Sequence, residues 1–161
     1  MASHCVNSRG QISIEYILLV IILLIYLQSF VQPVFESSIH SSQDVAAIGQ
    51  ASAAARKLAQ SIDFVGGSPA DMKQTISFYL PANTTLSCSG APAPAVQYTA
   101  TISLPHPACN NTTSCSGSIS VLGSLALNCG SLFTLNPGAV GGKYYSVMVY
   151  KQGGVVNVAP A

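Results

Sequence analysis

A single carboxylate, that of Glu15, lies at the start of a long apolar segment. Residues 17–35 contain fourteen Ile, Leu, Val or Phe side chains. Each contributes roughly −0.3 to −0.6 kcal/mol to membrane insertion, whereas an acidic residue at the centre of a membrane helix costs about 2.5 to 3.5 kcal/mol. The apolar residues therefore offset the cost of Glu15. Membrane insertion alone does not explain why a carboxylate is present.

A cut of the chain between Gly10 and Gln11 would provide a partner for this charge. The new α-amino group would lie four residues before Glu15, and an ammonium group is a natural counter-ion of a carboxylate at low dielectric. Within one helix the two groups would be one turn apart. Between neighbouring helices, the same pair could set the axial register.

Residues 11–16 have the sequence QISIEY and follow Arg9 and Gly10. This stretch resembles the Q-x-S-x-E-Y pattern of class III signal peptides, which are found on archaeal type IV pilin-like proteins. The match covers residues 1–27 and includes every fixed position and the apolar run that follows. It implies that a prepilin peptidase cleaves between Gly10 and Gln11, which leaves the apolar helix on the mature subunit. It carries no information about the rest of the chain.

The resemblance also implies the partners and the location of the protein. The precursor would insert in the membrane with its N-terminus, which carries Arg9, in the cytoplasm. A pilus assembly platform would then add the subunits to a helical homopolymer at the cell surface, where the filament serves adhesion or surface attachment. Glu15 would position each subunit. An archaeal flagellin is a related alternative, but this chain lacks the glycine-rich junction typical of that class.

Two other interpretations of the apolar segment remain. A plain signal anchor would hold an extracellular binding protein at the cell surface without polymerisation. A conventional secretory signal peptide is disfavoured, because residues 28–33, QSFVQP, contain no small-x-small cleavage site. Removal of the apolar segment as a secretory signal peptide would also leave Glu15 without a role.

The composition is hydrophobic and nearly free of charge. Hydrophobic residues make up 49% of the chain and charged residues 7%, and after Gln74 the only charged side chains are Lys143 and Lys151. Such a surface fits a protein that packs against copies of itself or carries sugars. Because the net charge is +1 and the chain has no basic cluster, we expect no nucleic-acid partner.

Four of the five cysteines lie beyond the leader, and an even set in an exported domain indicates two disulfides. Cys88, Cys109, Cys115 and Cys129 permit three connectivities, among which the sequence does not choose. We favour Cys109 with Cys115, which closes a small loop, and Cys88 with Cys129, which ties distant segments. A zinc site is the weaker alternative, since there is no Cys-x-x-Cys pair and His106 is the only nearby imidazole.

The hydrophobic periodicity predicts an α+β protein with three segments. The resemblance implies that residues 1–10 are the cleaved leader. Residues 11–66 are expected to form a long helix whose apolar, transmembrane part covers about residues 12–35. Residues 67–161 form an extracellular β-rich head. The second half of the helix is expected to pack on an antiparallel sheet of this head.

The expected helix has several local features. Pro33 removes a backbone bond and should bend the helix, and the serine-rich residues 36–43 could fray. Gly66 and Gly67 supply a C-terminal stop. A stripe of mostly small residues, at alternating steps of three and four, should face the sheet. Its members are Val45, Ile48, Ser52, Ala55, Ala59, Ile62 and Val65.

From residue 75 onward the hydrophobic period changes from that of a helix to that of a strand. The clearest alternation runs from Val96 to Leu104, and a similar row runs from Ile119 to Leu127. The short connections predict antiparallel pairing. The other expected strands are residues 75–80, 131–135, 144–150 and 155–158.

Three sequons lie in the expected head, at Asn83, Asn110 and Asn111. Each is a potential N-glycan acceptor if the head is exported. Because Asn110 and Asn111 are adjacent, modification of both is not expected. A glycan would hydrate the nearly uncharged head.

No pattern of catalytic residues emerges. His4 lies in the leader, His40 in the serine-rich stretch and His106 between two prolines in a loop, and no Asp or Glu follows Asp71. A catalytic triad, a carboxylate pair or a carboxylate metal site in the head would have to borrow from the helix. We therefore expect no enzymatic activity, no cofactor and no metal.

The tyrosines are expected in the strand core and on the sheet surface, although an exposed cluster would suit adhesion or sugar contact. They are Tyr79, Tyr98, Tyr144, Tyr145 and Tyr150. The sequence thus predicts a structural filament subunit. A single-helix, membrane-anchored binding protein that does not polymerise is the alternative.

Overall fold

The computed structural model describes residues 8–90, 93–122, 125–130 and 133–161, with side chains from residue 14 onward except that of residue 108. The chain divides into two compact units at the junction of His40 and Ser41. The first unit contains the apolar part of a long helix. The second unit, residues 41–161, contains the rest of that helix and the β-strands, and we call it the head unit.

Helix α1 spans Ser8–Gly67 as one element of 60 residues, which confirms the long N-terminal helix. It continues through Pro33 and through residues 36–43, so the expected fraying of the serine-rich stretch is wrong. Once a helix has formed, each further residue adds a hydrogen bond at the cost of fixing only itself. The helix ends at the predicted glycines, with Gly67 as its last residue.

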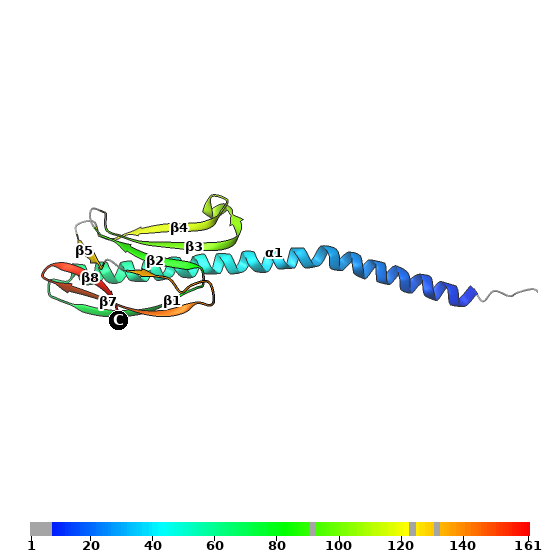
Figure 1. The fold of residues 1–161 in the computed structure, drawn as a ribbon, viewed down its shortest axis with the longest axis horizontal. Coiled ribbons are helices and arrows are strands. Elements are labelled where there is room, and N and C mark those ends of the chain that lie inside the picture. Colours follow the sequence, from blue (N-terminus) through cyan, green and yellow to red (C-terminus); the bar gives the residue numbers. More distant parts are fainter. Residues whose placement is uncertain (1–7, 91–92, 123–124, 131–132) are drawn as a thin grey trace, which may run out of the picture. The chain divides into compact units, whose positions relative to one another are not determined.

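Within the described residues, eight strands form two four-stranded sheets in the head unit (Figure 1). Sheet A has the strand order β1-β7-β8-β5, and sheet B has the order β4-β3-β2-β6. A short 3-10 turn, η1, precedes β4. The elements are β1 (Lys73–Leu80), β2 (Thr84–Ser89), β3 (Ala95–His106), η1 (Pro107–Cys109), β4 (Thr112–Ser120), β5 (Ala126–Cys129), β6 (Thr134–Leu135), β7 (Lys143–Gln152) and β8 (Val155–Pro160).

The strand predictions hold for β1, β3, β7 and β8 and need correction elsewhere. The row from Ile119 to Leu127 is divided between β4 and β5, which belong to different sheets. The sequence pattern misses β2, because its small polar residues, TTLSCS, hide the apolar alternation. The strand expected at residues 131–135 is reduced to β6, and residues 131 and 132 lie outside the described ones.

One pair of strands contradicts the antiparallel prediction. β5 pairs with β8 in parallel, with Ala126 opposite Val155 and Cys129 opposite Val158. The other printed pairs, such as β1 with β7 and β2 with β3, are antiparallel. A parallel pair needs a long connection, and here β6 and β7 lie between the two strands in the chain. The antiparallel prediction rested on the short connections between strands that follow each other in the chain, and β5 and β8 are not such strands.

The two sheets and the second half of α1 share one hydrophobic core. In Figure 1, sheets A and B lie on opposite sides of this part of the helix. Leu58 and Ile62 of α1 are fully buried, and the same core holds residues of both sheets. Those residues include Phe78, Val147 and Val156 from sheet A and Leu86, Val96 and Leu135 from sheet B.

The buried face of α1 differs from the predicted stripe. Val45 is 50% exposed, so the stripe does not extend that far. The face is also wider than predicted, because a helix that packs against two sheets must bury residues on more than one row. The predicted members Ala55, Ala59, Ile62 and Val65 are buried, and Ala51, Ala54 and Leu58 join them.

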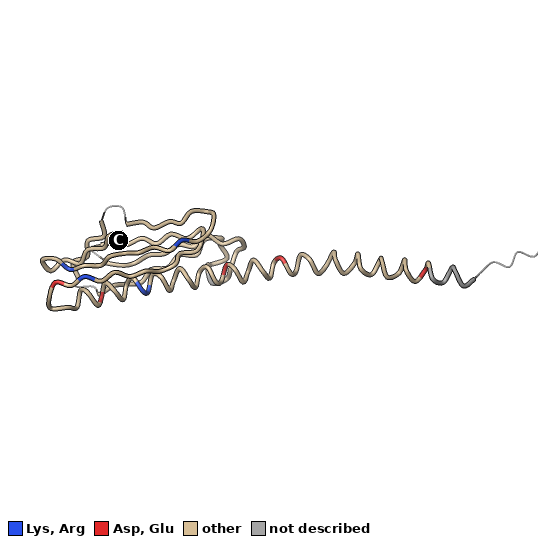
Figure 2. The backbone as a smooth tube through the Cα atoms, turned by 90° about the horizontal axis from the view of Figure 1, so that it is seen from below, with Lys and Arg blue, Asp and Glu red and all other residues tan. Residues whose placement is uncertain are grey.

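Charged side chains are sparse on the head unit, and long stretches of its chain contain none (Figure 2). Residues 41–161 contain five basic and three acidic side chains. Several of these charges are used inside the unit, as described below. Little charge is therefore left to hydrate the surface of the strands.

Candidate functional site

The apolar part of α1 is exposed along its whole length in the single chain. Each large apolar side chain from Ile14 to Phe35 has at least 36% of its surface exposed. Within the described residues, α1 is the one helix that is long and apolar enough to cross a membrane. An apolar surface of this extent is stable only in a membrane or against other apolar surfaces.

The predicted processing and assembly residues lie at the start of this surface. Glu15 is exposed, and the backbone of Gly10 and Gln11 is helical. Residues 11 and 15 are therefore one helical turn apart, as the proposed pairing of amine and carboxylate requires. His4 and Cys5, which the sequence places in the predicted leader, lie outside the described part of the chain.

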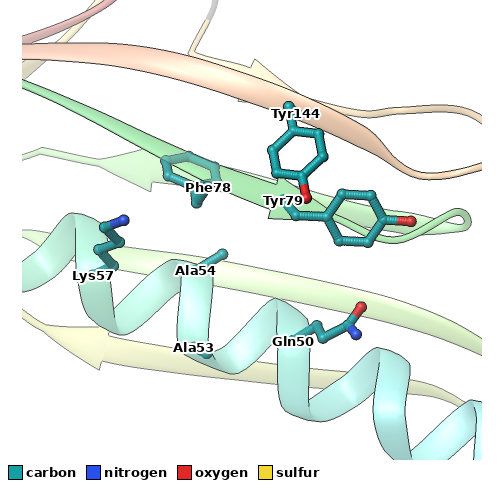
Figure 3. A pocket seen from close by; sticks show the side chains of 7 residues that line it. All are labelled: Gln50, Ala53, Ala54, Lys57, Phe78, Tyr79 and Tyr144. Atoms are coloured by element: carbon teal, nitrogen blue, oxygen red, sulfur yellow. The ribbon is translucent and has the colours of Figure 1, made fainter.

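Two of the tyrosines line a groove in the head unit (Figure 3). Tyr79 on β1 is the cross-strand partner of Tyr144 on β7, and their ring centroids lie 5.1 Å apart. Tyr144 is 78% exposed. By contrast, Tyr98 and Tyr145 are partly buried and pack against the core. Tyr79 is half-buried as well, but it lies beside the exposed Tyr144, and this pair is the part of the tyrosine set that lines the groove.

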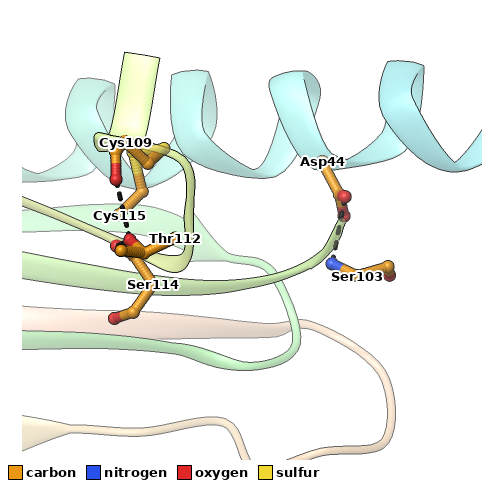
Figure 4. The surroundings of a disulfide bond; sticks show 6 residues. All are labelled: Asp44, Ser103, Cys109, Thr112, Ser114 and Cys115. Carbon is orange, nitrogen blue, oxygen red and sulfur yellow. Dashed lines mark hydrogen bonds between the residues drawn. A yellow bond between two sulfur atoms is a disulfide. The ribbon is translucent and has the colours of Figure 1, made fainter. Parts of the chain in front are cut away.

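The four cysteines beyond the leader form two disulfides, in the pairing favoured from the sequence. Cys88 on β2 is bonded to Cys129 on β5, so this bond joins sheet B to sheet A. Cys109 of η1 is bonded to Cys115 of β4 across a sequence separation of 6 (Figure 4). Disulfides are typical of proteins outside the reducing cytosol, and bonded cysteines are not zinc ligands.

Two aspartates of α1 bond to the backbone of the strands, and the sequence reasoning missed both. The Asp44 carboxylate accepts a hydrogen bond from the backbone N–H of Ser103 at 3.0 Å (Figure 4). It accepts a second from the N–H of Leu104 at 3.2 Å. The Asp63 carboxylate accepts one from the N–H of Leu122 at 2.9 Å. Carboxylates make strong hydrogen bonds to backbone donors. These bonds fasten the helix to sheet B and to the segment that leaves it.

Two lysines make the corresponding bonds to backbone carbonyls. Lys57 on α1 donates to the carbonyl oxygen of Ser77 on β1 at 2.7 Å. Lys151 on β7 donates to the carbonyl oxygens of Gly66 and Ser68 at 3.1 and 2.6 Å, at the C-terminal end of α1. Those carbonyls have no partner within the helix, so a cation there is favourable. The sequence contains few charged residues, so each of them could have been expected to have a specific bonding role, and this was the available signal for the two lysines.

We expect the Asp44→Ala variant to loosen the end of β3. Asp44 is 9% exposed, and loss of its carboxylate leaves two backbone donors without their acceptor, at a cost of about 1–3 kcal/mol. Hydrogen exchange of the Ser103 and Leu104 amides in the full chain should accelerate at least tenfold. Asp71→Ala is the matched control, because Asp71 is exposed. Equal protection of both amides in the two variants would contradict the role of Asp44.

The three sequons lie on exposed turns of the head unit. Asn83 lies between β1 and β2, and Asn110 and Asn111 lie between η1 and β4. All three have a φ of 57°, a left-handed conformation that Asn tolerates better than most residues. The side chains are therefore accessible to a glycosylating enzyme in the folded chain.

His106 lies at the end of β3 and not in a loop, which corrects the sequence-based placement. It is half-buried, and its carbonyl oxygen accepts a hydrogen bond from the N–H of Asn111 at 3.1 Å. Within the described residues, no group of three or more His, Cys, Asp or Glu side chains could hold a metal ion.

No protein-family model, curated protein or solved structure matches this chain. Its own residues therefore carry the functional conclusion. They define a long apolar helix suited to membrane anchoring, joined to an α+β unit with two disulfides of the kind found outside the cytosol.

Proposed function

We propose that the chain is a structural subunit of an archaeal type IV pilus-like surface filament, matured by cleavage between Gly10 and Gln11. The observation that carries this proposal is the uncovered apolar surface of residues 14–35 with Glu15 at its start. The resemblance of residues 11–16 to a class III signal peptide supports it.

The carboxylate favours a filament over a simple anchor. A lipid bilayer would cover the apolar side chains as well as neighbouring helices would, so these side chains do not distinguish the two functions. Glu15 does, because it is unfavourable among lipid chains and favourable beside an ammonium group. A filament core built from cleaved subunits supplies one α-amine for each Glu15.

The head unit suits the outer layer of such a filament. Its surface has few charges, which favours contacts with copies of itself. The two disulfides would stabilise it outside the cell. Glycans on Asn83 and on one of Asn110 and Asn111 would supply hydration that the side chains lack.

A membrane-anchored binding protein that does not polymerise is the second candidate function. The observation that favours it is the pair of half-buried Tyr79 and exposed Tyr144 in a groove of the head unit. Under this alternative Glu15 has no assembly partner. The two candidates therefore differ in the N-terminus and in the assembly state of the protein.

The test is the mature N-terminus of the protein from the native cell surface, measured by mass spectrometry, with negative-stain imaging of the same fraction. We expect a chain that begins at Gln11 and lies in thin filaments. Cells without the prepilin peptidase are the control and should retain the full-length chain in the membrane. An intact Met1 or Ala2 terminus on membrane-bound monomers of wild-type cells would refute the filament proposal in favour of the binding protein.

A further inference from the structure

A groove of about 460 Å³ lies between the second half of α1 and sheet A (Figure 3). This volume falls within the range of roughly 300–1,000 Å³ that is typical of small-ligand sites. Ala53 and Ala54 line it on the helix side, and larger side chains at these positions would fill it. The groove is open to solvent, so a ligand can enter without movement of the fold.

Three aromatic residues line the groove on the sheet side, and they are Phe78, Tyr79 and Tyr144. The rings of Tyr79 and Tyr144 are tilted by 56° to each other, with centroids 5.1 Å apart. Gly142 leaves room for the phenol end of Tyr79, because a Cβ at residue 142 would collide with the Tyr79 hydroxyl and would lie 2.7 Å from the Leu80 carbonyl oxygen. Tyr79 is thus held close to the backbone, while the ring of Tyr144 is 78% exposed to solvent.

The opposite wall supplies polar groups from α1. Gln50 and Lys57 are seven residues apart, about two helical turns, and both line the groove. The Lys57 ammonium donates one hydrogen bond to the Ser77 carbonyl oxygen, and an ammonium has three donors in all. Gln50 offers both a donor and an acceptor. Among the described residues that line the groove, none is acidic.

We propose that this groove binds a pyranose sugar. Such a ring has an apolar C–H face and a rim of hydroxyl groups, which matches an aromatic wall opposite an amide and an ammonium. Tyr144 and Tyr79 would contact the C–H face, and Gln50 and Lys57 would bond to the hydroxyls. A sugar that carries a carboxylate gains a charge-assisted hydrogen bond to Lys57. The site lies wholly in the head unit, so it does not depend on polymerisation.

The test uses the full chain in phosphatidylcholine nanodiscs, because maltoside detergents would themselves present sugars. Saturation-transfer NMR is recorded with maltohexaose as the neutral probe and trigalacturonate as the acidic probe. We expect transfer to the ring C–H protons of both probes and tighter binding of trigalacturonate. Tyr144→Ala should weaken binding of either probe roughly tenfold, as expected for loss of an aromatic contact of about 1.4 kcal/mol. Tyr144→Phe should retain binding within about threefold, because the ring remains.

Tyr150→Ala is the matched control, since Tyr150 lies on the same strand and lines a different hollow. The Tyr150→Ala variant should bind both probes with the affinity of the unmodified chain. Lys57→Gln should remove the preference for trigalacturonate and leave maltohexaose binding in place. The proposal is overturned if neither probe receives saturation from the unmodified chain, or if Tyr144→Ala binds as tightly as Tyr150→Ala. Either result leaves the filament proposal unaffected, because that proposal rests on the N-terminus.

Discussion

Under the filament proposal, cells that produce the Glu15→Ala variant are expected to lose their filaments while still processing and inserting the subunit. Removing one partner of a buried ion pair costs about 3–5 kcal/mol, because the other charge stays in low dielectric without compensation. Each 1.4 kcal/mol changes an equilibrium constant about tenfold. The equilibrium constant for addition of one subunit should therefore fall by roughly two to four orders of magnitude, which abolishes or disorders the polymer.

Glu36→Ala is the matched control for this experiment. Glu36 is an exposed carboxylate on the same helix, outside the motif, so its loss should leave the filament yield unchanged. The measurements are filament yield by negative-stain imaging and the mature N-terminus by mass spectrometry. Normal filaments from the Glu15→Ala variant would disprove the assembly role, and an unprocessed N-terminus would show that the carboxylate acts earlier, in cleavage.

Loss of the disulfide between Cys88 and Cys129 is expected to be the most damaging change to the head unit. Its sequence separation of 41 implies about 4 kcal/mol of stabilisation from loop closure, whereas the separation of 6 between Cys109 and Cys115 implies about 2.4 kcal/mol. The longer link also ties β5, a strand of four residues at the edge of sheet A, to sheet B. A domain is commonly stable by only about 5–15 kcal/mol.

Two double variants test this expectation, with Ala in place of Cys88 and Cys129 or of Cys109 and Cys115. Each variant removes two sulfur atoms, so the loss of packing is matched. Denaturant unfolding of the full chain in nanodiscs should show the larger loss of stability for the first variant. Limited proteolysis should then cut first near β5. Equal losses, or a greater loss for the shorter loop, would contradict the role of the link between sheets.

The two proposals describe different parts of one molecule. The proposed assembly role belongs to the apolar helix and Glu15, and the proposed sugar site belongs to the tyrosine groove of the head unit. A filament whose subunits each present one weak sugar site would gain affinity from many simultaneous contacts. Single sites with millimolar affinity would then be sufficient for attachment to a polysaccharide surface.

The sequence by itself was sufficient to predict the long helix, its apolar segment, the position of Glu15 and the strands β1, β3, β7 and β8. These features depend on local order. A helix is indicated by its period of 3.6 residues, its apolar length and its terminal glycines, and a strand by alternation over a few residues. The four cysteines that follow residue 10 likewise indicated two disulfides.

The tertiary structure alone decided how these elements combine. The division into two sheets, the parallel pair of β5 and β8 and the strand β2 depend on contacts between residues far apart in the chain, which local periodicity does not encode. The same holds for Asp44, whose partners Ser103 and Leu104 lie 59 and 60 residues away. The tyrosine groove likewise needs α1, β1 and β7 together, because they contribute four, two and one of its lining residues and none of them forms the site alone.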